Sequence, residues 1–231
     1  AMGRALDVAI MPQRCVFCGL ESDEPMCAGC EADLPWQRHA CFRCAAAVPV
    51  GTPPDVACAD CQAQPPPFER TVAPLAYAFP VDAAIAALKF RRKLYYLPAL
   101  ARILEQAADQ LPAGIDGVLP VPLHRWRRTR RGFNQSRELA VPVAKHLELP
   151  LIDSVRRVRA TPYQSGSTAA MRRRNLKSAF AVVGELEYDH VLIIDDVMTT
   201  GATVNELASL LKKNGVERIG VLCIARAPVR V

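Results

Sequence analysis

The chain lacks any long uninterrupted apolar run. No stretch of its 231 residues approaches the ~20 apolar residues that a membrane-crossing helix needs. The opening residues, AMGRALDVAIMPQRC, hold too short an apolar segment for a secretory signal. About half of the residues are apolar (51%), which is enough for a sizeable core. We therefore expect a globular cytoplasmic protein without membrane insertion.

Basic residues are scarce in the first third of the chain, and cysteine is scarce in the rest. Residues 1–68 hold 4 Lys and Arg against 8 Asp and Glu, whereas residues 69–231 hold 25 against 15. Eight of the nine cysteines precede residue 62, and Cys223 stands in an apolar run, as expected of a small core residue. The two segments therefore look like different domains. The basic one is a candidate for phosphate-bearing partners, with plain solubility as the alternative.

The cysteines of the first segment form four C-x-x-C pairs. Two thiolates at this spacing on a tight turn point at one centre, so two pairs supply the tetrahedral four-sulfur shell that Zn²⁺ prefers. The pattern predicts two structural zinc sites, with disulfide or redox chemistry and an iron–sulfur cluster as alternatives. The spacing allows sequential pairing or a crossed arrangement, and His39 could replace a ligand, although a surface position suits it better. The predicted ligands are Cys15, Cys18, Cys27, Cys30, Cys41, Cys44, Cys58 and Cys61.

Three consecutive prolines, Pro65 to Pro67, stiffen the chain into an extended spacer. We place the domain boundary there, with a zinc-ribbon domain at 1–67 and a larger domain at 68–231. Because the first segment has little else to fold around, its stability should depend on metal.

The larger segment alternates apolar strands with amphipathic helices. This alternation predicts an α/β fold with a parallel sheet flanked by helices. The predicted helices cover 81–90, 97–111, 133–149 and 203–215, and the predicted strands cover 115–123, 178–183, 190–197 and 218–227.

The stretch VLIIDDVMTTGAT, residues 191–203, joins an apolar run to two acids and a threonine-rich turn. The apolar run suits a buried strand, and in parallel sheets ligands bind beyond the carboxyl ends of such strands. The turn leads into a helix whose free N–H groups attract an anion, and Gly201 permits close approach. Since Asp195 and Asp196 can accept hydrogen bonds from vicinal hydroxyls, the shape wanted is a ribose 5-phosphate. The alternative is a helix cap behind an acidic turn.

At these residues the chain resembles the type I phosphoribosyltransferases, whose signature is an apolar strand, two acids, a short spacer and Thr-Gly-x-Thr. Together with the cysteine pairs, PLHRWRRTRRGFNQ (122–135) and TPYQSGSTAAMRRRNLKSAF (161–180) narrow the resemblance to the ComF/GntX family of competence-associated proteins. The resemblance implies a type I phosphoribosyltransferase fold preceded by a small zinc-ribbon domain.

The resemblance also implies roles for particular residues. Asp195 and Asp196, the catalytic pair, would bind the ribose 2- and 3-hydroxyls of phosphoribosyl diphosphate (PRPP). The 5-phosphate would bind Thr199, Thr200, Gly201, Ala202 and Thr203. The diphosphate loop would be Pro122, Leu123, His124 and Arg125, and a flap over the reacting centre would contribute Gln164, Arg172, Arg173 and Asn175.

The implied reaction is displacement at the ribose anomeric carbon, with diphosphate leaving. It needs no side-chain nucleophile, because Mg²⁺ and arginines neutralise the departing charge and the acid pair favours a cation-like ring. His124 could act as a general acid, although a solvated loop histidine is the better interpretation. The acceptor is left open between a purine, a pyrimidine, another amine and water.

Five arginines occur within residues 125–131, around Trp126. With the RRVR and RRR stretches, they could form a track for single-stranded DNA with Trp126 as a stacking face, or simply a solvated face. The second hypothesis is thus a non-catalytic module that senses PRPP or keeps a vestigial site. Such a module would engage single-stranded DNA or a DNA-uptake helicase.

Overall fold

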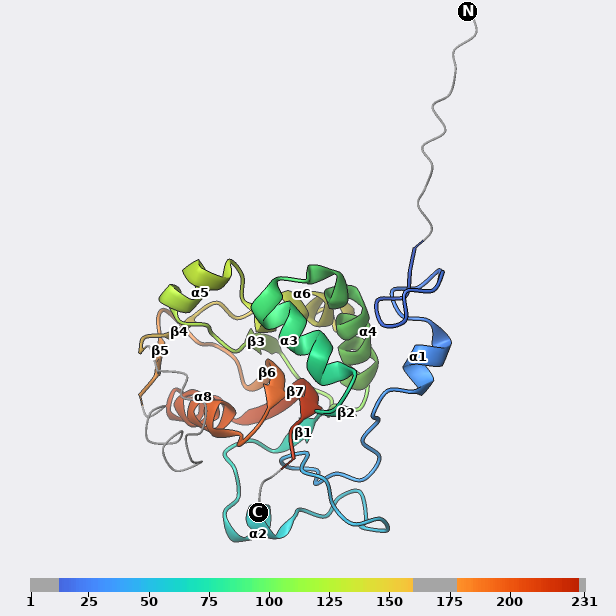
Figure 1. Ribbon diagram of the computed structural model, residues 1–231. Coiled ribbons are helices and arrows are strands. Elements are labelled where there is room, and N and C mark those ends of the chain that lie inside the picture. The colour runs from blue at the N-terminus through green and yellow to red at the C-terminus, as the bar shows by residue number, and fades with distance from the viewer. Residues whose placement is uncertain (1–12, 160–177, 229–231) are drawn as a thin grey trace, which may run out of the picture.

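The computed structural model describes residues 13–159 and 178–228 (Figure 1). The helices are α1 (Ala28–Ala32), α2 (Ala59–Ala63), α3 (Val81–Arg91), η1 (Leu94–Tyr96), α4 (Leu97–Ala108), α5 (Arg125–Arg131), α6 (Gln135–His146) and α8 (Ala202–Lys213). The strands are β1 (Arg70–Val72), β2 (Leu75–Ala76), β3 (Gly117–Pro120), β4 (Val155–Arg157), β5 (Phe180–Val182), β6 (His190–Met198) and β7 (Arg218–Arg226).

A parallel sheet forms the centre of the molecule. Its strand order is β1-β7-β6-β3, and β2 also pairs with β7 in parallel. The long strands β6 and β7 are consecutive in the chain and are joined through α8, as the sequence predicts. The antiparallel pair β4-β5 lies outside this sheet. The predicted α/β architecture is therefore confirmed.

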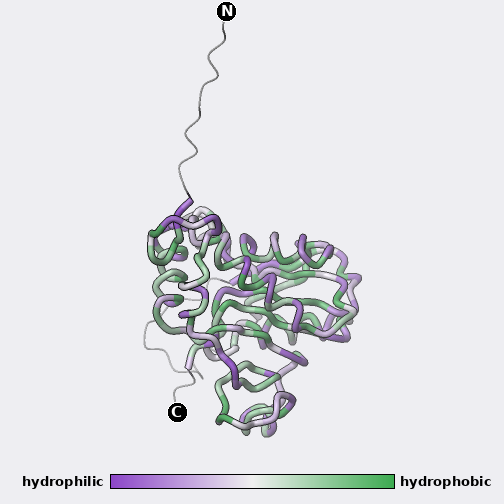
Figure 2. The backbone as a smooth tube through the Cα atoms, turned by 90° about the vertical axis from the view of Figure 1, so that its right-hand side faces the viewer, coloured by the Kyte–Doolittle hydropathy of each residue, from purple (hydrophilic) through white to green (hydrophobic). Residues whose placement is uncertain are grey.

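Helices cover both faces of the sheet (Figure 1). Since successive side chains of a strand point to opposite faces, Leu192 and Ile194 pack in one core with residues of α3, α4 and α6. Val191 and Ile193 pack in a second core with residues of α8. Figure 2 shows the hydrophobic stretches running through the interior of the molecule. Cys223 is fully buried in the second core, which confirms its interpretation as a core residue.

The amino-terminal segment packs onto these same cores. Met26 and Leu34 belong to the core of α3, α4 and α6, whereas Ala45 belongs to the other core together with Phe68. Trp36 forms a bridge to Leu75 of the edge strand β2. Apolar side chains from both sides of the prolines at 65–67 are thus buried together, and the boundary placed there stays a prediction.

The elements that the sequence did not predict are the short strands β1, β2 and β4 and the helices α1, α2, η1 and α5. β1 and β2 hold three and two residues, too few to show a period. Within residues 13–159 and 178–228, no helix has the length and apolar character to cross a membrane.

Candidate functional sites

The acid pair lies in the second half of β6. The neighbouring strand β3 ends at Pro120, which pairs with Ile194, so Asp195 and Asp196 follow the point where that neighbour stops. On the other side β7 continues alongside, with Asp195 opposite Cys223. Asp196 is 6% exposed and Asp195 is partly exposed. Both acids therefore lie at the carboxyl-end edge of the sheet, where the sequence predicts them.

Two helices reach the acid pair with polar side chains. Lys89 of α3 places its Nζ 2.7 Å from Asp196 Oδ2. Ser136, in the first turn of α6, donates its hydroxyl to Asp195 Oδ1 at 3.0 Å. Neither residue was predicted. Lys89 sits in a predicted helix without any motif, whereas Ser136 directly follows the FNQ triplet of the family-like stretch, a weak signal that could have found it.

The electrostatics of the pair follow from its crowding. Burial, and then the neighbouring charge of Asp196, raise the pKa of Asp195 to about 7, against the opposing effects of Lys89 and of the Ser136 hydroxyl. Burial lowers the pKa of Lys89, but the attraction of Asp196 and Asp195 outweighs it and leaves that pKa raised. Lys89 is thus a charged partner of the acids at neutral pH. Because Asp195 is partly protonated there, the two acids together carry less than two negative charges.

The turn after β6 ends in a glycine that begins a helix. Gly201 has φ 73°, in the left-handed region, and is the N-cap of α8. Thr199 and Thr200 are exposed, and the Thr200 hydroxyl accepts the amide N–H of Ala202 at 3.4 Å. Thr203 lies in the first turn of the helix. A helix start with free N–H groups and nearby hydroxyls is suited to an anion such as a phosphate.

The predicted diphosphate loop lies at the same edge of the sheet. Pro122, Leu123 and His124 connect β3 to α5, and Arg125 is the first residue of α5. Since β3 and β6 are parallel, this connection and the acid pair share the carboxyl-end edge. His124 Nδ1 accepts the backbone N–H of Trp126 at 3.3 Å, which favours a structural loop histidine over a general acid.

The predicted flap belongs to a part of the chain that the structure does not describe. Gln164, Arg172, Arg173 and Asn175 lie outside the described residues, so their contacts with the site stay predictions.

The eight cysteines gather into two four-cysteine centres. The first consists of Cys15, Cys18, Cys27 and Cys30, and the second of Cys41, Cys44, Cys58 and Cys61, with all four sulfurs of each within 4.8 Å of one another. The pairing is therefore sequential, which decides between the two arrangements that the spacing left open. His39 is exposed and belongs to neither centre, as its surface interpretation expected.

Within each centre some thiol pKa values are lowered and others are raised. Burial raises the pKa of Cys15, but hydrogen bonds from backbone amides outweigh it and lower that pKa to about 6. The same balance lowers the pKa of Cys41 to about 7, and the backbone amide of Cys58 donates to the Cys41 sulfur. Burial raises the pKa of Cys44 to about 11 and that of Cys61 still further. Four thiolates so close together require a cation, and four sulfurs in a closed shell fit Zn²⁺ in a structural role.

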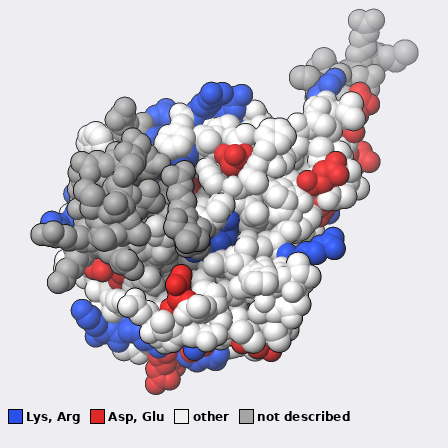
Figure 3. All heavy atoms as spheres, turned by 60° about the horizontal axis from the view of Figure 1, so that its bottom comes forward, with Lys and Arg blue, Asp and Glu red and all other residues white. Residues whose placement is uncertain are grey.

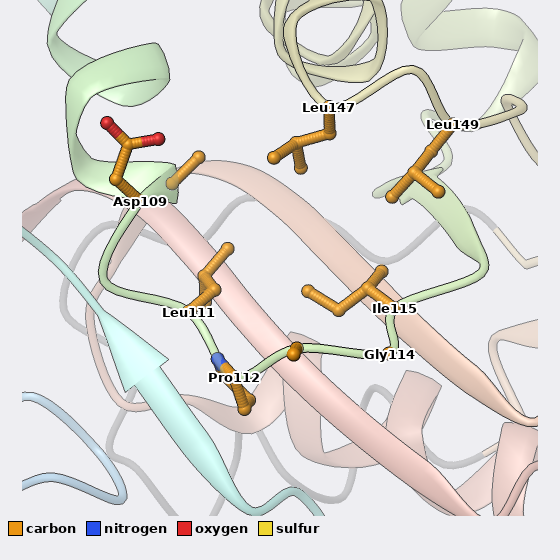
Figure 4. Close-up of a pocket in the computed structure, with 9 residues that line it drawn as sticks. Asp109, Leu111, Pro112, Gly114, Ile115, Leu147 and Leu149 are labelled. Carbon is orange, nitrogen blue, oxygen red and sulfur yellow. The ribbon is translucent and has the colours of Figure 1, made fainter.

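One hollow of about 270 Å³ lies away from these sites (Figure 4). It is lined mainly by apolar side chains, such as Leu111, Ile115, Leu147 and Leu149, from the segments after α4 and after α6. Its polar member, Asp109, is paired with His146 at 3.2 Å. Because Ile115 precedes β3, the hollow lies at the opposite edge of the sheet from the acid pair.

The fold, the acid pair and the four-cysteine centres define a phosphoribosyltransferase-like protein with an amino-terminal double zinc ribbon. The sequence matches the phosphoribosyl transferase domain family over residues 134–231 and the double zinc ribbon domain family over residues 6–64. Three relatives carry the likeness across most of the chain. A DNA utilization protein YhgH of Salmonella typhi is 36% identical over 226 residues, which cover 94% of this chain and 98% of that protein.

The protein of the same name in Escherichia coli K12 is 39% identical over 73% of this chain and 77% of its own length. Competence protein F of Haemophilus influenzae is 37% identical over 74% of this chain and 78% of its own length. A solved glutamine PRPP amidotransferase from B. subtilis aligns with a TM-score of 0.43 at 16% identity, over 67% of this chain and about a third (32%) of that enzyme. The extent of the first three matches shows that the chain belongs to the ComF/GntX family.

Proposed function

We propose that this chain binds PRPP and transfers its ribose 5-phosphate to an acceptor, with release of diphosphate. The observation that carries the proposal is the succession of Asp195, Asp196 and the start of α8 at one edge of a parallel sheet. The two carboxylates would accept the ribose hydroxyls, and the N–H groups of residues 199–203 would hold the 5-phosphate.

The acids and their partners suit a reaction with a cation-like ring. A carboxylate pair beside the sugar favours positive charge there, and Lys89 keeps Asp196 in place from α3. Ser136 orients Asp195 from α6. The loop 122–125 faces the same edge and would hold the diphosphate, whose charge Mg²⁺ would neutralise when bound. The oxygen donors of the acid pair are of the kind that Mg²⁺ prefers.

Calorimetry tests this proposal directly. Wild-type protein titrated with PRPP and Mg²⁺ should bind, and the double variant Asp195→Asn, Asp196→Asn should lose that binding. Asp189→Asn is the matched control, because this exposed acid immediately precedes the opposite end of β6. Absence of binding by the wild type would remove the proposal. A screen for diphosphate release with purines, pyrimidines, other amines or water would then identify the acceptor.

A second candidate function is the binding of single-stranded DNA, for which the surface formed by α3 and α5 is suited. The names of the relatives, DNA utilization protein and competence protein F, support a role with DNA. The end of α5 lies against the end of α3, where the Arg131 guanidinium stands 5.7 Å from the Phe90 ring centre. Trp126 is 60% exposed and Phe90 is 66% exposed, so both rings can stack on bases.

We call this α3–α5 surface the basic aromatic surface: Phe90, Arg92, Tyr95, Trp126 and Arg131. This surface includes Phe90, Arg92 and Tyr95 in addition to the arginine stretch seen in the sequence. The Arg92 guanidinium lies next to the end of α5, 3.7 Å from the position that a Cβ atom on Gly132 would take. Figure 3 brings the lower side of Figure 1 forward, where basic and acidic side chains are interspersed among the described residues. A DNA-uptake helicase stays a further predicted partner.

Titration with single-stranded oligothymidylate over a range of salt concentrations tests this surface. Affinity should fall steeply as salt rises, and Trp126→Ala and Phe90→Ala should weaken it. Phe79→Ala is the control, because Phe79 is also exposed but lies just before the other end of α3. Flat salt dependence, or equal effects of all three substitutions, would argue against the basic aromatic surface.

A further inference from the structure

Arg226, the last residue of β7, is a buried arginine that joins two parts of the molecule. Its side chain is 6% exposed. Its Nε donates to the backbone carbonyl of Cys44 at 2.9 Å. Its Nη1 donates to the carbonyl of Met198 at 3.0 Å, to that of Thr199, and to that of Ala227 at 2.9 Å. One guanidinium therefore contacts a ligand residue of the second four-cysteine centre and the second and third residues after the acid pair.

The second centre is built into the sheet edge at this point. The amide of Thr71 in β1 donates to the carbonyl of Phe42 at 3.0 Å. Ala45, next to Cys44, is buried with φ 53°, and its carbonyl accepts the side-chain amide of Gln37 at 2.6 Å. The position of the Cys44 carbonyl thus depends on the turn that presents Cys41 and Cys44 to the metal.

Among the described residues, no comparable contact joins the first centre to the acid pair or to the turn after it. Its surroundings contact α4 and η1, where Phe17 packs 5.9 Å from Tyr96 between ring centres and Glu24 pairs with Arg102. The two centres therefore supply a matched comparison within one chain.

The contacts of Arg226 bear on the direction of the loop amides. In a trans peptide the carbonyl of one residue and the N–H of the next point in opposite directions. With the carbonyls of Met198 and Thr199 turned toward Arg226, the N–H groups of Thr199 and Thr200 point away from it. Those are the first two donors of the loop proposed to hold the 5-phosphate.

We propose that Arg226 couples the second four-cysteine centre to the phosphate-binding loop, because the Cys44 carbonyl holds the guanidinium and the guanidinium orients the loop amides. This rests on the proposed function for the identity of the ligand, but the coupling itself exists without ligand. Arg226 is a positioning residue. A lysine in its place keeps the charge but cannot donate in several fixed directions at once.

Backbone amide spectra of the zinc-loaded full chain without ligand test the coupling. Arg226→Lys should shift the signals of Thr199 and Thr200, and so should Cys58→Ser, which opens the second centre. Arg218→Lys, at the exposed start of the same strand, and Cys18→Ser, in the first centre, should leave them in place. Unmoved loop signals in both Arg226→Lys and Cys58→Ser would overturn the proposal.

Coupling is reciprocal, so a second measurement keeps the test decisive if Cys58→Ser fails to fold. Arg226→Lys should speed zinc release from the second centre and leave release from the first unchanged. Its affinity for PRPP with Mg²⁺ should fall about tenfold. Unaltered release together with unmoved loop signals would refute the coupling. If the wild type binds no PRPP yet its loop signals follow Arg226, the coupling stands and only the PRPP function fails.

Discussion

Lys89 Nζ lies 2.7 Å from Asp196 Oδ2, although 107 positions separate the two residues in the chain. The contact brings the end of α3 against the acid pair of β6. The Asp196 side chain is 8% exposed and that of Lys89 is 29% exposed, so water screens this ion pair only in part.

Replacing Lys89 should destabilise the protein. Lys89→Met leaves the buried carboxylate of Asp196 without its cation, and we expect the free energy of unfolding to fall by about 1–3 kcal/mol. Urea unfolding measures this, with Lys145→Met on the exposed side of α6 as the control. Adding Asp196→Asn to Lys89→Met should restore part of the loss. A double variant no more stable than Lys89→Met alone would contradict the pairing.

Stability should depend on pH through Asp195. Its pKa of about 7 in the folded protein lies above the ordinary value of 3.8, so the folded state holds the proton more tightly between these values. The contribution of Asp195 to the free energy of unfolding is present at low pH and is lost as pH rises through about 7. Urea unfolding at a series of pH values should show this decline, and Asp195→Asn should flatten it. Equal pH slopes for wild type and variant would exclude Asp195 as the source.

The two metal centres should release zinc at different rates. Cys18 of the first centre is exposed, whereas Cys41 and Cys61 of the second are buried at 0% and 6% exposure. Zinc release to a chelator with an absorbance signal should therefore show a fast and a slow phase. The melting temperature of the protein should fall once the slow phase is complete. Cys18→Ser should abolish the fast phase and Cys58→Ser the slow phase. Loss of the same phase in both variants would show that the centres are not independent.

Replacing Gly201 should affect both the stability of the protein and its affinity for PRPP. Both Gly201 and Gly215 have positive φ, 73° and 96°, so alanine at either position should lower the free energy of unfolding by about 1 kcal/mol. Only Gly201→Ala should also weaken PRPP binding, because Gly201 lies in the loop proposed to hold the 5-phosphate, where an added methyl group would restrict the approach of the backbone. Thermal melting and calorimetry on both variants make this comparison. Equal PRPP affinity of Gly201→Ala and Gly215→Ala would place the phosphate elsewhere.

Much of the fold could be predicted because its signals are local. Helices α4, α6 and α8 show their period within a dozen residues, and β6 and β7 are apolar runs with clear ends. β1 and β2 are too short for any pattern, and they exist because β7 offers them an edge. α5 was hidden in the arginine stretch, which has no apolar face to give it a helical period.

The sequence by itself determined which eight cysteines are ligands, and it determined the signature. Two cysteines separated by two residues meet on one turn, and an apolar run, two acids and a Thr-Gly turn follow one another within 13 positions. Only the tertiary structure decided that the cysteine pairs combine sequentially, that Lys89 and Ser136 meet the acids, and that Arg226 meets Cys44. Apart from the sequential cysteine pairing, these contacts join residues 59 to 182 positions apart, so they depend on which strands are neighbours in the sheet. No short stretch of sequence carries that information, because the energy that selects the strand order is spread over the whole buried core.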